Sequence, residues 1–163
     1  MHPDAPDGRV PPDDGVEMSG EEVSSFLAAS GDGVLSLAGD PPLSVPMSFA
    51  VASGGRPLFQ SLGGPDSEKG DRLRDGLGAS LVCFERTTPD DWASVVVTGD
   101  LVAVDRTHER QAAFAEQAAP VGMTVFGAEA ADLDVQWYEL EPSSATGRSG
   151  PGWEPPNTFG ETR

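Results

Sequence analysis

Three of the chain's ten basic residues lie within six positions of one another. Lys69, Arg72 and Arg74 follow a glycine-rich turn, and Ser61 and Ser67 place hydroxyl groups before them. A phosphate needs hydroxyl or backbone donors and a cation, and the amides at a helix N-terminus also favour anions. Because a helix is expected to begin at this point, the segment predicts a phosphate anchor.

A structural interpretation of the same cations stays open. Lys69 and Arg72 could form a solvated helix face that pairs with Glu68, Asp71 and Asp75. Lys69 is nevertheless the sole lysine of a chain that otherwise uses arginine, and its position beside the hydroxyl residues favours a specific role for it.

Other kinds of reactive site find little support. Cys83 is the only cysteine, so neither an internal disulfide nor a cysteine-based metal site is expected, and Cys83 itself is interpreted as a core thiol. His2 lies in a terminal segment, and His108 lies in the first turn of an expected helix. We therefore predict no metal site. The chain contains no P-loop, dinucleotide fingerprint or nucleophile elbow.

The elements that would position these residues are mostly strands. Ser19 to Glu22 match a capping box and predict a short helix. Further helices are expected from Asp66 or Ser67 to about Leu77 and from Asp105 to Ala119. Apolar alternation and β-branched runs predict six strands, at residues 34–37, 43–51, 58–61, 81–85, 93–104 and 135–140.

Two residues mark irregularities in these strands. Pro46 cannot donate to a ladder and therefore predicts an edge or bulge position. Gly99 lies within the long apolar strand that starts at Ala93 and predicts a bend there. Six strands with few helices between them favour a mainly β, antiparallel barrel over a doubly wound sheet.

The length predicts one domain with flanking segments of different composition. Residues 1–18 are rich in Pro and Asp, and residues 143–163 are rich in Ser, Gly, Pro and Thr. Both are expected to be flexible tails around a domain at residues 19–142.

Four segments resemble one known family in their order and spacing. They are Pro46-Met47-Ser48-Phe49, then Phe59-Gln60-Ser61, then Ser67-Glu68-Lys69 with Arg72 behind it, and finally the strand from Trp92 to Gly99. Together they resemble the pyridoxamine-phosphate-oxidase-like family of FMN-binding split β-barrels. The resemblance extends from about Val23 to Arg148 and implies a six-stranded antiparallel split barrel.

The resemblance implies a set of residues that bind FMN. Ser61, Ser67 and Lys69 would hold its phosphate, Gln60 and Ser94 would reach the ribityl or phosphate region, and the strand around Met47 would face the ring through backbone groups. Trp92 could face the flavin or fill the core, whereas Trp137 is expected in the core. The full set is Pro46, Met47, Ser48, Phe49, Phe59, Gln60, Ser61, Ser67, Lys69, Trp92 and Ser94.

The implied function is a flavin-dependent oxidoreductase that acts on an unidentified small molecule, with the cofactor at the interface of a homodimer. Alternatives are a non-enzymatic flavin or haem carrier and a deazaflavin-binding relative. Glu68 and Glu139 stand where oxidases of pyridoxamine phosphate would carry basic residues, so a second phosphate would be poorly held. No catalytic residue is assigned.

The charge and the lack of an evident export signal indicate where the protein works and which partners it can bind. The chain carries 27 acids against 10 basic residues, a formal charge of -17 that is spread along its length. This favours adaptation to concentrated salt and disfavours a nucleic-acid partner, which requires a basic surface. No apolar segment reaches the roughly 20 residues of a membrane span, and no signal peptide is evident. We therefore expect a halophilic, cytoplasmic protein without a membrane partner.

Overall fold

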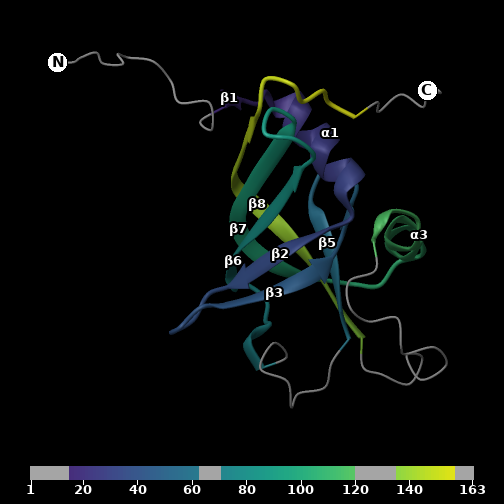
Figure 1. Ribbon diagram of the computed structural model, residues 1–163. Coiled ribbons are helices and arrows are strands. Elements are labelled where there is room, and N and C mark those ends of the chain that lie inside the picture. The colour runs from purple at the N-terminus through teal and green to yellow at the C-terminus, as the bar shows by residue number, and fades with distance from the viewer. Residues whose placement is uncertain (1–14, 63–70, 120–134, 157–163) are drawn as a thin grey trace.

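The computed structural model describes residues 15–62, 71–119 and 135–156. These residues form eight β-strands and two long helices (Figure 1). In chain order the elements are β1 (Val16–Glu17), α1 (Gly20–Ser30), β2 (Asp32–Leu37), β3 (Leu43–Ser48), β4 (Ala50–Val51), β5 (Pro57–Leu62), β6 (Gly78–Arg86), β7 (Trp92–Val104), α3 (His108–Gln117) and β8 (Val135–Ser149).

All strands belong to one curled antiparallel sheet. Its order is β3-β2-β6-β7-β8-β5-β4, and β1 pairs with the end of β8. The six strands with six or more residues correspond to the six that the sequence predicted. The predicted fold class, a mainly β antiparallel split barrel, is confirmed.

The two ends of the strand order are parts of one chain segment. β3 ends at Ser48 and β4 begins at Ala50, so only Phe49 separates them. β3 pairs with β2, whereas β4 pairs with β5 at the other end of the sheet. The buried Phe49 therefore lies where the curled sheet meets itself, and we call this junction the seam.

The main core fills the inside of the curled sheet. Side chains alternate between the two faces of a strand, so every second residue of the long strands points inward. The inward residues include Leu35, Met47, Phe59, Leu81 and Val95, all of which are buried. The outward residues of β2, β3, β6 and β7 are left for other contacts.

Helix α1 closes one end of the barrel. Ser19 and Glu22 form the predicted capping box, with Glu22 N donating to Ser19 Oγ at 3.1 Å. The apolar face of the helix buries Phe26, whose ring makes an edge contact with Trp153 at a centroid distance of 6.1 Å.

Helix α3 lies outside the sheet, beside β5 (Figure 1), and packs against β4 and β5. Thr107 caps its N-terminus, and none of its residues is fully buried. Phe114 packs edge-on against Trp137 at a centroid distance of 5.6 Å, and Trp137 forms a second small core with Ala52 and Leu58. The structure thus confirms the predicted place of Trp137 in a core.

Three expected boundaries differ from the structure. β8 extends to Ser149 and pairs with β7, so residues 143–149 are not a flexible tail. At the other end, Val16 and Glu17 pair with β8, so the sheet includes residues that precede the expected domain start at residue 19. The helix expected to reach Leu77 is wrong in its last part, because helical structure ends at Arg72 and Gly76 has a positive φ of 88°.

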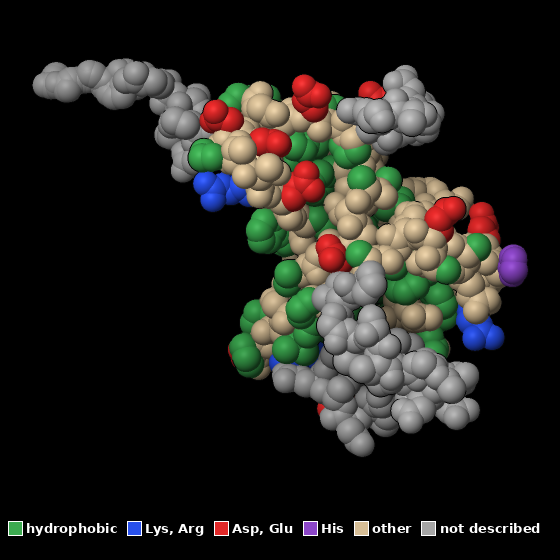
Figure 2. Space-filling view, turned by 45° about the vertical axis from the view of Figure 1, so that its right-hand side comes forward, with side chains coloured by type: hydrophobic (Ala, Val, Ile, Leu, Met, Phe, Trp, Pro, Cys, Tyr) green, Lys and Arg blue, Asp and Glu red, His purple; other side chains and the backbone are tan. Residues whose placement is uncertain are grey.

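Acidic side chains are scattered over the surface. Figure 2 shows them as separate points on one face and not as a single patch. None of the helices in the described segments is long and apolar enough to cross a membrane.

Candidate functional site

A row of apolar side chains crosses the outer face of the barrel. Pro46 of β3 lies opposite Val34 of β2, Val34 lies opposite Val82 of β6, and Val82 lies opposite Val96 of β7. Neighbouring strands are about 4.8 Å apart, so the row spans about 14 Å. With Phe84, which follows Val82 on the same face, these residues form what we call the apolar strip.

Two side chains of the apolar strip are unusually exposed. Phe84 has 70% of its surface open to solvent and Val96 has 38%. A single exposed apolar residue is common, but a continuous row of them on a sheet face indicates a binding surface.

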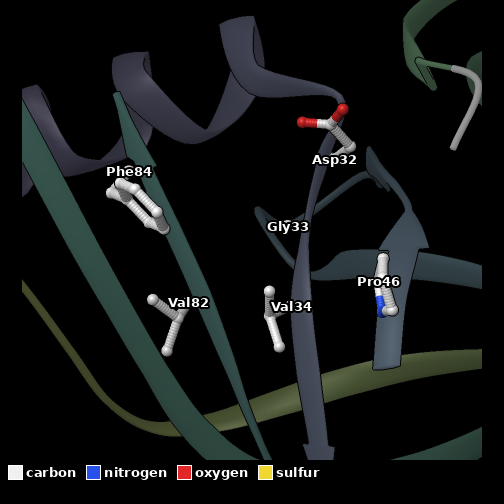
Figure 3. A pocket seen from close by; sticks show the side chains of 6 residues that line it. All are labelled: Asp32, Gly33, Val34, Pro46, Val82 and Phe84. Carbon is white, nitrogen blue, oxygen red and sulfur yellow. The ribbon is translucent and has the colours of Figure 1, made fainter. Parts of the chain in front are cut away.

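A shallow hollow lies within the apolar strip (Figure 3). It has a volume of about 220 Å³ and is lined by Asp32, Gly33, Val34, Pro46, Val82 and Phe84. Figure 3 shows that the lining side chains come from three adjacent strands, with Val82 and Phe84 on one, Val34 on the next and Pro46 on the third. Asp32, at one end, is the only charged residue among the six.

Three predicted site residues lie on this outer face. Pro46 lines the hollow, and Ser94 lies directly opposite Phe84 in the register of β6 and β7. Ser48, two residues after Pro46, faces the same way and donates its hydroxyl proton to the carbonyl oxygen of Ala119. The outer face therefore combines an apolar surface with nearby hydroxyl groups.

Four predicted residues point into the barrel instead. Met47, Phe49, Phe59 and Ser61 are buried, and the rings of Phe49 and Phe59 lie 6.1 Å apart at a tilt of 42°. Their side chains are therefore parts of the core. Any contact they make with a ligand on the outer face must come from their backbone groups.

The structure separates Gln60 from the hollow. Gln60 lies opposite Trp137 on the side of the sheet that α3 covers. The indole Nε1 of Trp137 is buried and has no hydrogen-bond partner among the residues that the structure describes. A buried donor without a partner costs about 1–3 kcal/mol. A hydrogen-bond acceptor placed beside Gln60 and Trp137 would therefore be stabilised by the indole N–H.

Trp92 lies against Gly15 and Gly150. A side chain at Gly150 would come within 2.6 Å of the Trp92 indole nitrogen, and Gly150 N donates to Trp92 O at 2.9 Å. Because Trp92 does not line the hollow, these contacts support a packing role.

The predicted phosphate anchor is only partly within the described residues. Ser67 and Lys69 lie outside them. Arg72 donates from Nη1 to the carbonyl oxygen of Pro41 at 2.6 Å, which ties it to the turn between β2 and β3. The anchor assignment therefore remains a prediction.

The carboxylate of Glu139 is buried under α3. The sequence had suggested instead that it stands where a related oxidase would carry a basic residue for a substrate phosphate. Glu139 Oε2 accepts from Arg110 Nε at 3.0 Å, and Oε1 lies 3.8 Å from Arg56 Nη1. Two arginines therefore compensate Glu139. A polar pocket of about 460 Å³ beside it is lined by residues that include Ser53, Thr107 and Arg110. Strand alternation, which puts Glu139 and Trp137 on one face, could have indicated that α3 covers both.

The buried thiol is unsuited to chemistry. Burial raises the pKa of Cys83 to about 12, and the negative charge of Asp32 adds to the effect. Burial, followed by the charge of Asp75, also raises the pKa of Tyr138. A thiol with so high a pKa is protonated at neutral pH and is a poor nucleophile.

No cluster of three or more metal-ligating side chains occurs in the described part of the chain.

The fold and site define a split β-barrel with an apolar outer face. The family model for pyridoxamine 5'-phosphate oxidase matches residues 19–149, so the chain belongs to this family. No curated protein sequence matches it.

Solved structures show the same fold at low sequence identity. A FAD-binding protein from Mycobacterium smegmatis is 18% identical, with a TM-score of 0.60 over 82% of this chain and 98% of that one. A FAD-binding protein from Mesorhizobium loti is 21% identical, with a TM-score of 0.61 over 81% and 93%. A haem-binding protein from Mycobacterium smegmatis is 18% identical, with a TM-score of 0.61 over 81% and 54%.

Proposed function

We propose that this protein binds FMN, with the isoalloxazine ring lying on the apolar strip. The observation that carries the proposal is the hollow itself, where a highly exposed Phe84 and a row of apolar side chains lie between Pro46 and Ser94. A flavin ring needs a flat apolar wall with a few hydrogen-bonding groups at its edge, and this face provides both. Flavin binding by structural relatives supports the proposal.

The size of the hollow supports a shared site. Ligand pockets usually enclose about 300–1,000 Å³, and the hollow in one chain measures about 220 Å³. One chain would therefore supply one wall of the site. We propose that a second copy of the chain supplies the other wall and that the protein is a homodimer.

The charge distribution is consistent with this dimer. Two chains of charge -17 repel each other, so contact is least costly where the surface carries few acids. Side chains around the apolar strip include the hydroxyls of Ser94, Ser36 and Ser44, and the oxygens of the last two lie 2.7 Å apart. Concentrated salt, which shortens the Debye length to about 3 Å at 1 M, would weaken the remaining repulsion.

The lining of the hollow favours a flavin over haem. Haem iron takes an imidazole, thiolate, thioether or phenolate ligand. None of the six residues that line the hollow carries such a group. A structural relative is a haem-binding protein, so haem is tested as the alternative ligand. The six residues that line the hollow nevertheless offer no ligand for iron.

The proposed activity is that of an oxidoreductase acting on a small molecule. Bound FMN would supply hydride chemistry, while the chain would orient the ring and exclude water from one of its faces. Ser67 and Lys69 are the residues proposed to hold the phosphate. Glu139 is paired with two arginines, so its negative charge is offset and would not repel an anionic substrate as an unpaired carboxylate would.

The decisive experiment is to identify the bound chromophore. The protein, purified in high salt, should have the absorption bands of an oxidised flavin, and denaturation should release FMN as judged by chromatography. The apoprotein should bind FMN more tightly than FAD, haem or a deazaflavin in parallel titrations. Bleaching by NAD(P)H would support the oxidoreductase. A haem spectrum, or no binding of FMN at millimolar concentration, would refute the proposal.

A further inference from the structure

Three separate parts of the chain converge on the carbonyl oxygen of Gly31. This oxygen accepts from Phe49 N at 2.9 Å and from Ala119 N at 3.0 Å. It thereby joins the end of α1, the seam between β3 and β4, and the residues that follow α3. The seam is thus held from outside the sheet by the end of a helix.

The convergence requires glycine at position 31. Its φ is 81°, in the left-handed region that side chains disfavour. A Cβ atom there would also lie 2.8 Å from the Gln117 carbonyl oxygen and 3.0 Å from Ala119 N. The end of α3 therefore approaches the backbone more closely than any other residue at position 31 would allow.

Gln117 completes the hydrogen bonding of the short edge strand β4. Its Oε1 accepts from Val51 N at 2.9 Å, and its Nε2 lies 3.4 Å from Val51 O as a donor. The side-chain amide thus takes the place of a neighbouring strand at this edge. Because α3 has no fully buried residue, such polar contacts account for much of its attachment to the seam.

The same segment determines how Ser48 can meet a ligand. A serine hydroxyl has one proton to donate and two lone pairs that accept. Ser48 donates its proton to the carbonyl oxygen of Ala119, two residues after Gln117. The oxygen of Ser48 is then left as an acceptor, and a ligand group that meets it must carry an N–H or O–H.

We infer that Gln117 is a positioning residue that, by holding the end of α3 at the seam, fixes Ser48 as a hydrogen-bond acceptor for a donor group of the bound cofactor. This inference rests on the proposed function. Gln117 does not touch the cofactor. It acts through Val51 and Ala119 on the strand that carries Ser48 and Pro46.

A double-mutant cycle with Ser48→Ala tests this role. FMN affinity is measured by fluorescence titration in matched high salt, well below the melting temperature of each variant. Gln117→Leu should weaken binding about tenfold, the usual effect of one lost hydrogen bond. Gln117→Glu, whose carboxylate still accepts from Val51 N, should stay within about threefold of the wild type. In the Ser48→Ala background, Gln117→Leu should have less than about a twofold effect, because residues that act as a unit are not additive.

Gln111 provides a matched control, since it is an exposed glutamine on the same helix. Gln111→Leu should leave the affinity unchanged. If Gln117→Leu does not fold, Gln117→Ser takes its place in the cycle. Additive effects of the Gln117 and Ser48 changes, or equal losses from Gln111→Leu and Gln117→Leu, would overturn the inference alone. Failure of the wild-type protein to bind FMN would overturn the proposed function and this inference with it.

Discussion

Arg110 and Glu139 join α3 to the barrel through a bond of 3.0 Å between Nε and Oε2. Glu139 is buried, whereas the Arg110 side chain is 27% exposed. Arg56 lies 3.8 Å from the other carboxylate oxygen and is a weaker partner. Most of the compensation for this buried charge therefore comes from the helix.

Removing Arg110 should destabilise the protein. Arg110→Ala leaves Glu139 buried with one distant partner, and we expect the free energy of unfolding to fall by about 1–3 kcal/mol. Urea denaturation at constant salt measures the change. Adding Glu139→Gln should recover part of the loss, and Arg106→Ala, at a nearby exposed arginine, should have little effect. Equal losses from Arg110→Ala and Arg106→Ala would contradict the role of the pair.

Phe84→Glu should separate folding from dimer formation. The side chain is 70% exposed in one chain, so the monomer should fold with nearly the same melting temperature. A buried charge at the dimer interface should weaken association about tenfold or more. Sedimentation in high salt measures it. Val16→Glu, at an apolar residue whose side chain is 62% exposed, provides the control. A wild-type protein that sediments only as a monomer would rule out the dimer.

Lys69→Ala tests the phosphate anchor. Loss of a charge-assisted contact should weaken FMN binding by roughly 1.5–3 kcal/mol, or about ten- to a hundredfold, without unfolding the barrel. Lys69→Arg should recover binding only in part, because the guanidinium differs in shape and reach. Fluorescence titration at matched high salt gives the affinities, with Arg106→Ala as the control for lost positive charge. Unchanged affinity in Lys69→Ala would remove Lys69 from the site.

The pKa of Cys83 predicts a loss of stability at high pH. The thiol has a pKa of about 12 in the folded protein and about 9.0 in the unfolded chain. Above pH 9 the unfolded state binds fewer protons, so the free energy of unfolding should fall by up to about 1.4 kcal/mol per pH unit as pH rises towards 12. Well below pH 9, where the thiol is protonated in both states, this group contributes no slope.

Cys83→Ala separates this effect from that of Tyr138, whose pKa burial also raises. The variant should be less stable at neutral pH because it leaves a cavity, but it should lose less stability between pH 9 and pH 10.5. Chemical denaturation at a series of pH values provides both slopes. Parallel curves for the two proteins would contradict the high pKa of the thiol.

The sequence predicted the six long strands because their alternation was strong, but it missed the second half of β8. Pro142, Ser144 and Gly147 have the composition of a loop, yet this segment pairs with β7 along its length. A strand of 13 residues such as β7 needs a partner of similar length, and that requirement is tertiary.

Prediction of the site from family motifs had a similar limit. The motifs gave the strands near the hollow, whereas strand parity decides which side chains reach it. Pro46 and Ser48 face outward, and Met47 and Phe49 face the core. Phe84 was absent from the predicted set because a single phenylalanine in an apolar run gives no sign that it will be exposed.

The seam also constrains how this chain can change length during evolution. The segment that contains β3 and β4 pairs with β2 before Phe49 and with β5 after it, so both halves are held in fixed register. One inserted residue would move the inward side chains of one half to the outer face and expose its apolar residues. Two inserted residues would restore the alternation of inward and outward side chains. Insertions and deletions at this point should therefore survive in even numbers, and length variation among descendants of this sequence should concentrate elsewhere.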